Sequence, residues 1–279
     1  MEKIQYVIDK KNYDVSLVGS PKLEYGKPEF LSNSETDISF GQDWYKAGFE
    51  TYNFLNEVEF DLLKSGLTQC ISKIVSEHVE NIEGFSLDNY HHFVKSDEVH
   101  HKVVAVTRHL FPADFNFPLN DIITRFEKLI GFGLTDTDPD SGDQLQIIIR
   151  INRPRSKDFN PPHKDIYEGW DRESILMKFV NLWIPIAGVN NLSSLPVVPG
   201  SHLMSEDKIL RTFEGGILEG KQYRVRAVAE WDGSNELVRP EVDYGEVLMF
   251  SAHLIHGLAF NDQEDQTRVA LEFRLFKKG

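Results

Sequence analysis

The sequence predicts a mainly β fold with flanking helices, in which helices come early and an antiparallel double-stranded barrel comes late. Two segments before residue 144 have apolar residues at helical spacing. After residue 144, short apolar stretches recur, and turns rich in Gly, Pro, Asn and Asp separate them. That rhythm is typical of a β-sandwich or barrel.

The length of 279 residues suits one domain, because all-β barrels of this size commonly form a single unit. We expect this domain to cover residues 1–279. Residues 1–143 would form a peripheral extension and supporting helices, and residues 144–279 the catalytic barrel core.

Two helices are expected before the barrel. Asn56 can cap the first, and Glu59 at its third position completes a capping-box pattern. Its apolar positions are Leu63, Leu67, Cys70, Ile71, Ile74 and Val75. The second helix covers residues 120–130, with an apolar side made of Ile122, Ile123, Phe126, Leu129 and Ile130.

Strand-like alternation begins at residue 144. Leu145, Ile147, Ile149 and Ile151 would face one way, and Gln146, Arg150 and Asn152 the other. Further strands are expected at residues 179–186, 195–198, 224–229, 246–250 and 268–276. A shorter alternating stretch covers residues 13–18.

Composition excludes several classes of protein. The net charge of −14 would repel a phosphate backbone, so no nucleic-acid partner is expected. No apolar run approaches the ~20 residues that span a bilayer, and no secretory signal is visible, so no membrane partner is expected. The single cysteine, Cys70, fits a reducing cytoplasm and is expected to be a buried small hydrophobe. The oligomeric state is left open.

Chemistry-bearing residues occur in an ordered set. His163 and Asp165 form an H-x-D pair, and on an extended strand residues two apart point the same way. A distant His256, delivered by a second strand, would complete two histidines and one carboxylate on one face of a metal ion. The opposite face stays open, which is the arrangement of non-haem iron(II) oxygenases. Arg268 follows twelve residues later, and its planar fork suits a carboxylate.

Each of these pieces has an ordinary alternative: a solvated turn, a structural histidine, or a surface ion pair. Their combined order resembles the phytanoyl-CoA dioxygenase family of iron(II)/2-oxoglutarate oxygenases, which includes ectoine hydroxylase. Members read H-x-D, a Trp-containing strand, a Pro-Gly-Ser-His turn, His-Gly, and an Arg about eleven residues on. Residues 144–276 contain, in the same order, His163-Lys164-Asp165, Trp183, Pro199-Gly200-Ser201-His202, His256-Gly257 and Arg268.

The resemblance implies a double-stranded β-helix, the jelly-roll or cupin-like barrel, with Fe(2+), 2-oxoglutarate and O2 as cofactor and cosubstrates. It implies that His163, Asp165 and His256 bind the iron. Arg268 would hold the distal carboxylate of 2-oxoglutarate, with Trp183 beside it. Gln146 and Asn152 are further candidates for cosubstrate contacts, and a buried hydrogen bond within the barrel is the equal alternative for both.

The sequence also departs from the family pattern. Leu258 stands where relatives often carry Ser, and residues 191–194 replace the usual Asn-Gly before the turn. His253 lies three residues before His256 and is the alternative distal ligand; His256 is preferred because Gly257 follows it. Ser201 and His202 are interpreted as turn residues. A second histidine group, His91, His92, His100 and His101, is interpreted as a solvated loop, with a mobile lid as the alternative.

The implied reaction is hydroxylation of a small-molecule metabolite with formation of succinate and CO2. Related halogenases replace the ligating carboxylate with a small residue, so Asp165 favours hydroxylation, while desaturation and ring chemistry stay open. The main alternative is a non-catalytic barrel that binds a metabolite or metal. A cupin-type enzyme would need an H-x-H pair, which the sequence lacks. The substrate itself does not follow from the sequence.

Overall fold

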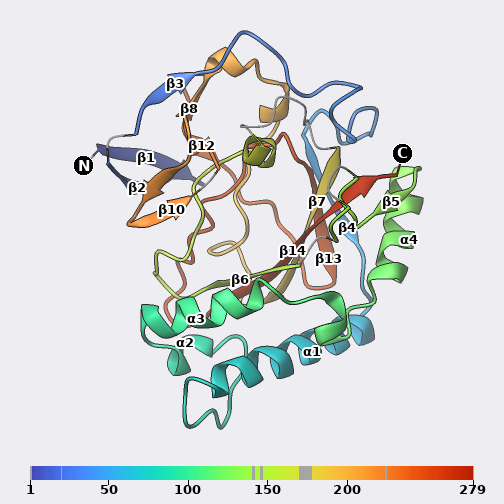
Figure 1. Ribbon diagram of the computed structural model, residues 1–279, viewed down its shortest axis with the longest axis vertical. Coiled ribbons are helices and arrows are strands. Elements are labelled where there is room, and N and C mark those ends of the chain that lie inside the picture. The colour runs from blue at the N-terminus through green and yellow to red at the C-terminus, as the bar shows by residue number, and fades with distance from the viewer. Residues whose placement is uncertain are drawn as a thin grey trace.

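The computed structural model describes residues 2–19, 21–139, 142–144, 147–169, 178–223 and 225–278. The strands of the described residues form three β-sheets. Helices α1 and α3 lie below them in Figure 1, and α4 lies at the right, beside the C-terminus. The helices are α1 (Glu57–Ser76), α2 (Tyr90–Phe93), α3 (Asp97–Thr107) and α4 (Leu119–Ile130), with short 3-10 turns η1 (Pro112–Phe115), η2 (Asp165–Gly169), η3 (Ser201–Leu203) and η4 (Glu206–Lys208). The strands are β1 (Glu2–Ile8), β2 (Lys11–Val18), β3 (Leu23–Tyr25), β4 (Phe49–Asn53), β5 (Leu134–Thr135), β6 (Ile148–Asn152), β7 (Phe179–Ala187), β8 (Ile209–Thr212), β9 (Gly216–Leu218), β10 (Lys221–Tyr223), β11 (Val228–Trp231), β12 (Glu236–Leu237), β13 (Glu246–Ser251) and β14 (Arg268–Lys277).

The major sheet has the order β4-β13-β7-β14-β5, and β6 also pairs with β14. Its strands pair antiparallel, and in this register Trp183 of β7 lies opposite Glu272 of β14. Because side chains alternate along a strand, the two faces differ in character. One face carries Leu182, Ile184, Leu271 and further apolar residues of the main hydrophobic core. The other face carries the polar residues of the site.

The helices cover the apolar face of this sheet. Helix α1 has the predicted capping box, since Asn56 accepts from the Glu59 backbone and the Glu59 side chain accepts from the Asn56 backbone. Leu67 of α1 and Phe126 of α4 are fully buried in the core shared with the sheet. Leu129, expected on the apolar side of α4, is instead 43% exposed, so that part of the prediction was wrong.

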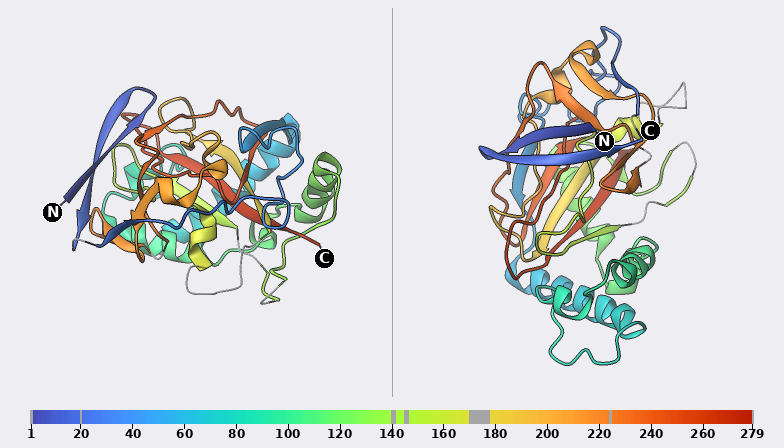
Figure 2. Two further views of the ribbon diagram at one scale, coloured as in Figure 1. Left: turned by 90° about the horizontal axis from the view of Figure 1, so that it is seen from above. Right: turned by 90° about the vertical axis from the view of Figure 1, so that its left-hand side faces the viewer.

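Two smaller sheets, β10-β9-β2-β1-β12 and β11-β8-β3, lie away from the helices. Figure 2 shows the β1–β2 hairpin at the side of the molecule where the N-terminus lies, crossing in front of the other strands when seen from that side. The first 53 residues thus contribute to all three sheets, because β4 forms an edge of the major sheet and β3 an edge of the smallest. The division expected at residue 144 therefore does not separate the sheets from the rest of the chain. The mainly β prediction is confirmed, and the sheets are not closed.

Individual strands differ from expectation in detail. The expected strand at residues 195–198 is only an isolated pairing of Val197 with Val238 and His256. Of the strand expected at residues 224–229, the described part begins as β11 at Val228. In the run expected from residue 144, strand β6 begins at Ile148, and residues 145, 146 and 224 lie outside the described residues. Cys70 is partly buried against the main core, where burial raises the pKa of its thiol, as suits an inert side chain. Among the described residues, no helix has the length and apolarity needed to cross a membrane.

Candidate metal centre

His163 and His256 lie side by side although 93 positions separate them in the sequence. Their backbones pair in both directions, with N–O distances of 2.9 and 3.0 Å. Their rings lie 4.5 Å apart between centroids. Asp165 completes the group: its Oδ1 lies 3.3 Å from Nε2 of His163 and 3.8 Å from Nε2 of His256. All three side chains are buried, and their ligand atoms lie within 4.8 Å of one another.

The backbone orients both rings. Nδ1 of His163 lies 2.8 Å from the Pro161 carbonyl oxygen, and Nδ1 of His256 lies 3.0 Å from that of Leu254. Because a carbonyl only accepts, each ring donates from Nδ1 and keeps the lone pair of Nε2 directed at the centre of the group. Burial also lowers the pKa of His256, against the opposing effect of Asp165. Neutral imidazole is the form that binds a metal.

Gly257 explains why glycine follows the histidine. Its φ of +129° is a conformation that side chains disfavour, and an added Cβ would lie 2.4 Å from the carbonyl oxygen of Pro161. That oxygen is the one that holds His163. The His-Gly pair thus brings the two histidine segments to the distance that the group requires.

Asp165 does not lie on an extended strand, so the prediction that His163 and Asp165 share one strand was wrong. His163 is in the isolated bridge, and Asp165 begins η2, closed by a hydrogen bond from Tyr167 N to Lys164 O of 3.0 Å. The turn directs the carboxylate back toward the imidazoles, so the ligand atoms still meet. Side-chain alternation on a strand correctly predicted that Asp165 lies beside the histidines, but a 3-10 turn rather than a strand places it there.

A guanidinium group also faces Asp165. Nη2 of Arg274 lies 2.9 Å from Oδ1, the oxygen nearest both imidazoles. Burial would raise the pKa of Asp165, but Arg274 and then the two histidines hold it well below its usual value. The carboxylate is therefore ionised and available to a cation.

Arg268 is the first residue of β14 and lies buried on the same inner face as Arg274. Its Nη1 donates to Oδ1 of Asn152 at 2.5 Å, and its guanidinium carbon lies 5.3 Å from the centre of the Trp183 ring. Burial, reinforced by Arg150, lowers the pKa of Arg268 to about 9, so it remains a cation at neutral pH. Asn152 uses its oxygen to accept from Arg268 and its amide hydrogens to donate to the carbonyls of Asp158 and Ala259, which are buried hydrogen bonds of the kind given as the alternative to a cosubstrate contact. Gln146 lies outside the described residues.

The inner face contains four polar residues that the sequence analysis missed. They are Arg150, Asn181, Glu272 and Arg274. Burial would raise the pKa of Glu272, but Arg150, at 2.6 Å, lowers it to about 2. Alternation along β14 could have found two of them, because Glu272 and Arg274 share the parity of Arg268. Three guanidinium groups and two carboxylates thus surround one interior.

These residues fit an iron ion and a dicarboxylate. Several buried polar atoms have no hydrogen-bond partner in the described part of the chain: Nε2 of His256, Nε and Nη2 of Arg268, Nε1 of Trp183, and both amide atoms of Asn181. Unsatisfied buried polar atoms are costly, so a cluster of them indicates a ligand site. The donor set, two imidazoles and one carboxylate, is the one that non-haem iron(II) prefers.

The other motif histidines lie apart from this group. Nε2 of His253 faces the carbonyl oxygen of Thr36 at 3.2 Å, so the structure places His256 rather than His253 against His163 and Asp165. Ser201 and His202 both belong to η3. The His202 ring faces the carbonyl oxygen of Tyr45, and Oγ of Ser201 accepts a hydrogen bond from Ile255 N at 2.8 Å. Both are turn residues, as interpreted from the sequence.

Fold and interior together define an iron- and 2-oxoglutarate-dependent oxygenase with a jelly-roll barrel. Residues 77–269 match the family model described as phytanoyl-CoA dioxygenase (PhyH), and the chain belongs to this family. Membership of this family, together with the group of His163, Asp165 and His256, implies iron as cofactor and 2-oxoglutarate and O2 as cosubstrates.

Solved structures include similar folds. EctD from S. alaskensis, crystallised with 2-oxoglutarate and 5-hydroxyectoine, is 13% identical with a TM-score of 0.50, over 94% of this chain and 86% of that chain. AviO1 from Streptomyces viridochromogenes Tue57 is 14% identical with a TM-score of 0.46, over 90% of this chain and 97% of that chain. The likeness to EctD shows a shared fold. No curated protein matches the sequence.

Proposed function

We propose that the protein hydroxylates a small-molecule metabolite and forms succinate and CO2, with His163, Asp165 and His256 holding Fe(II). The proposal rests mainly on one observation: Nε2 of His163 and Nε2 of His256 both lie close to Oδ1 of Asp165 inside the barrel. Both Nδ1 atoms are already engaged, so the pair can act only through Nε2.

Arg268 is proposed to bind the distal carboxylate of 2-oxoglutarate. It is a buried cation with Nε and Nη2 free of partners among the described residues, and Trp183 covers its face. Two parallel N–H groups match two carboxylate oxygens. Asn152 holds the third nitrogen, Nη1, and so orients the fork.

Bound iron with 2-oxoglutarate and O2 supplies the oxidising power: one oxygen atom of O2 enters the substrate as hydroxyl, and the other enters succinate as 2-oxoglutarate loses CO2. The protein's own part is to hold the ligands and exclude water. His163, Asp165 and His256 are each at most 3% exposed, so little solvent reaches their ligand atoms.

Three protein ligands support hydroxylation over halogenation. A carboxylate in the third protein position leaves three sites on a six-coordinate ion, two for 2-oxoglutarate and one for O2, so a halide has no place. Asp165 is therefore the residue on which the proposed reaction type depends.

The direct test is to load the purified chain with Fe(II), supply 2-oxoglutarate and O2, and measure succinate against a panel of metabolites. Metabolites that accelerate succinate release identify candidate substrates, and mass spectrometry should find a gain of one oxygen atom. His163→Ala should remove both signals while circular dichroism stays unchanged. Succinate release that is equally fast in His163→Ala would contradict the assignment.

A further inference from the structure

A second group of metal-binding side chains lies outside the barrel interior. His91 and His92 of α2 both face Asp265, which lies three residues before β14. Oδ1 of Asp265 lies 2.9 Å from Nε2 of His91 and 2.6 Å from Nε2 of His92. These histidines were expected in a solvated loop, which was wrong, because they lie on a short helix. Neighbours on a helix point about 100° apart rather than oppositely, so both rings can reach one partner.

One ring of this pair is already oriented as a metal ligand. Nδ1 of His91 lies 2.9 Å from Oγ1 of Thr267, and the backbone N of His91 donates to the same oxygen. Thr267 is fully buried, so this anchor is rigid. A histidine that binds metal through one nitrogen commonly has its other nitrogen fixed by such a partner.

The surroundings favour a cation. Asp265 pairs with no lysine or arginine in the described chain, and its contacts there are the two imidazoles. The neighbouring acids are already paired, Asp262 with Lys11 and Glu264 with Arg155. The carboxylate that the histidines share is thus the one in this segment whose charge no basic side chain balances.

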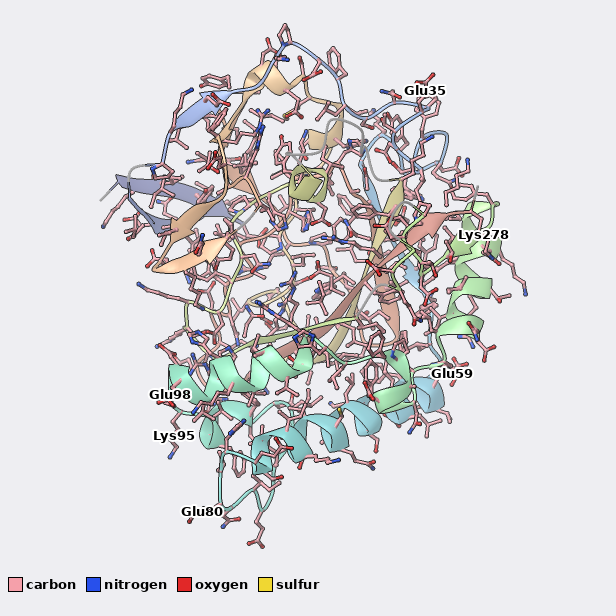
Figure 3. The ribbon with its side chains drawn as sticks, viewed as in Figure 1. Glu35, Glu59, Glu80, Lys95, Glu98 and Lys278 are labelled. Carbon is pink, nitrogen blue, oxygen red and sulfur yellow. The ribbon has the colours of Figure 1, made fainter. Side chains whose placement is uncertain are left out.

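The geometry also permits an ion to enter. Asp265 and His92 are 73% and 51% exposed in their side chains, so they can move apart by the small amount that metal bonds of about 2.0–2.2 Å require. This corner is at the periphery, where the labelled Lys95 and Glu98, next along the chain, also lie (Figure 3).

We propose that His91, His92 and Asp265 form a second site, at the surface, for a borderline divalent cation of the Zn2+ class. Two imidazoles and one carboxylate supply three ligands, and water completes the tetrahedron. The ion would join α2 to the segment that enters β14, directly before Arg268. It is a site separate from the barrel interior and does not depend on the proposed reaction.

Zn2+ binding to the chelator-treated chain tests this proposal, with stoichiometry measured by equilibrium dialysis. The wild type should bind two ions, His256→Ala one, Asp265→Asn one, and the double variant none. Thr267→Val should weaken the surface site about 10- to 100-fold, because it frees His91 Nδ1. His101→Asn, which changes an exposed histidine of α3 outside both groups, is the matched control and should bind two.

The two sites fail in different ways. A His256→Ala chain that binds no Zn2+, or an Asp265→Asn chain that still binds two, would overturn the surface site. A His256→Ala chain that still binds two ions, one of them lost on adding Asp265→Asn, would support the surface site and count against the barrel triad.

Discussion

Asn152 and Arg268 face each other across the antiparallel pair β6–β14, and Oδ1 of Asn152 accepts a 2.5 Å hydrogen bond from Nη1 of Arg268. The two residues are direct partners in the register, so the sheet itself sets their distance. The amide hydrogens of Asn152 are held by backbone carbonyls, which fixes which of its atoms meets Arg268. This hydrogen bond therefore orients Nε and Nη2 of Arg268.

Replacing Arg268 with Ala should weaken 2-oxoglutarate binding by about 2–5 kcal/mol, because one buried charge-assisted pair is lost. Arg268→Lys should recover only part of this, since an ammonium lacks the planar fork. Titration with 2-oxoglutarate under anaerobic conditions measures both. Arg155→Ala, at an exposed arginine, is the control; equal affinity for wild type and Arg268→Ala would sink the assignment.

Asn152→Ala should weaken the same binding by about 1–3 kcal/mol, because Nη1 of Arg268 loses its partner inside the barrel. The effect should largely disappear in an Arg268→Ala background, where there is no fork left to orient. A double-mutant cycle on cosubstrate affinity measures this coupling. Additive losses would mean that Asn152 contacts 2-oxoglutarate independently.

Replacing His253 and His256 one at a time with Ala separates their roles. His256→Ala should lose iron and turnover, because Nε2 of His256 is turned to Asp165. His253→Ala should keep both, since its ring faces the Thr36 carbonyl, and should lose mainly stability from a fully buried position. Iron content and succinate formation decide this, and the opposite pattern would make His253 the ligand.

Asp165→Ala should abolish hydroxylation and vacate one position on the metal. Chloride should then perturb the iron absorption spectrum of the variant but not that of the wild type. A metal-bound structure of the wild type gives the direct measurement: an oxygen of Asp165 should lie about 2.0–2.2 Å from the ion. An oxygen more than about an ångström farther out would make Asp165 an orienting partner of His163 instead.

The stability of the fold should depend on His100 between about pH 6.5 and pH 4. Burial lowers the pKa of His100 to about 4, against the opposing effect of Asp158. The unfolded chain takes up a proton there before the folded one, so this contribution is complete above about pH 6.5 and is lost as the pH falls toward 4.

Unfolding in urea of the wild type and of His100→Gln tests this prediction. The stability gap between them should shrink by as much as about 3 kcal/mol from pH 7 to pH 4, since the variant has no group to titrate. His101→Gln, at an exposed position of the same helix, is the control. A gap for His100→Gln that stays constant with pH would contradict the prediction.

The local patterns of the chain predicted much of the fold. The capping box of α1 and the strands β7, β13 and β14 follow from residues close together in sequence. The pairing of strands that are distant in sequence could not be predicted. Strands β1 and β2 show ordinary alternation, and no local feature indicates that they pair with β12 and β9. Non-local pairing is fixed by burial of whole faces, which single segments do not encode.

The site divides in the same way. Motif spacing predicted that His163, Asp165, His256 and Arg268 share one interior, and the family resemblance added Trp183. The structure places the three ligand candidates together, and Arg268 beside Trp183. Arg150 was expected to face the same way as Asn152, but neither it nor Glu272 was expected in the site, because a charged residue in a strand ordinarily lies on the solvated side. Only the packing of the inner face makes them an ion pair in which Glu272 is buried and Arg150 is partly buried.

The alternation of apolar and charged residues along β14 limits which sequence changes this strand can accept. Its odd positions pack against the helices and its even positions contain the charged groups of the interior. Deleting Val269, which directly follows Arg268, would turn Leu271 and Phe273 into the interior and Glu272 and Arg274 into the helix-covered core. Neither the hydrophobic core nor the catalytic chemistry would survive that exchange. An inserted or deleted residue within β14 should therefore be tolerated less well than a substitution or a change in loop length.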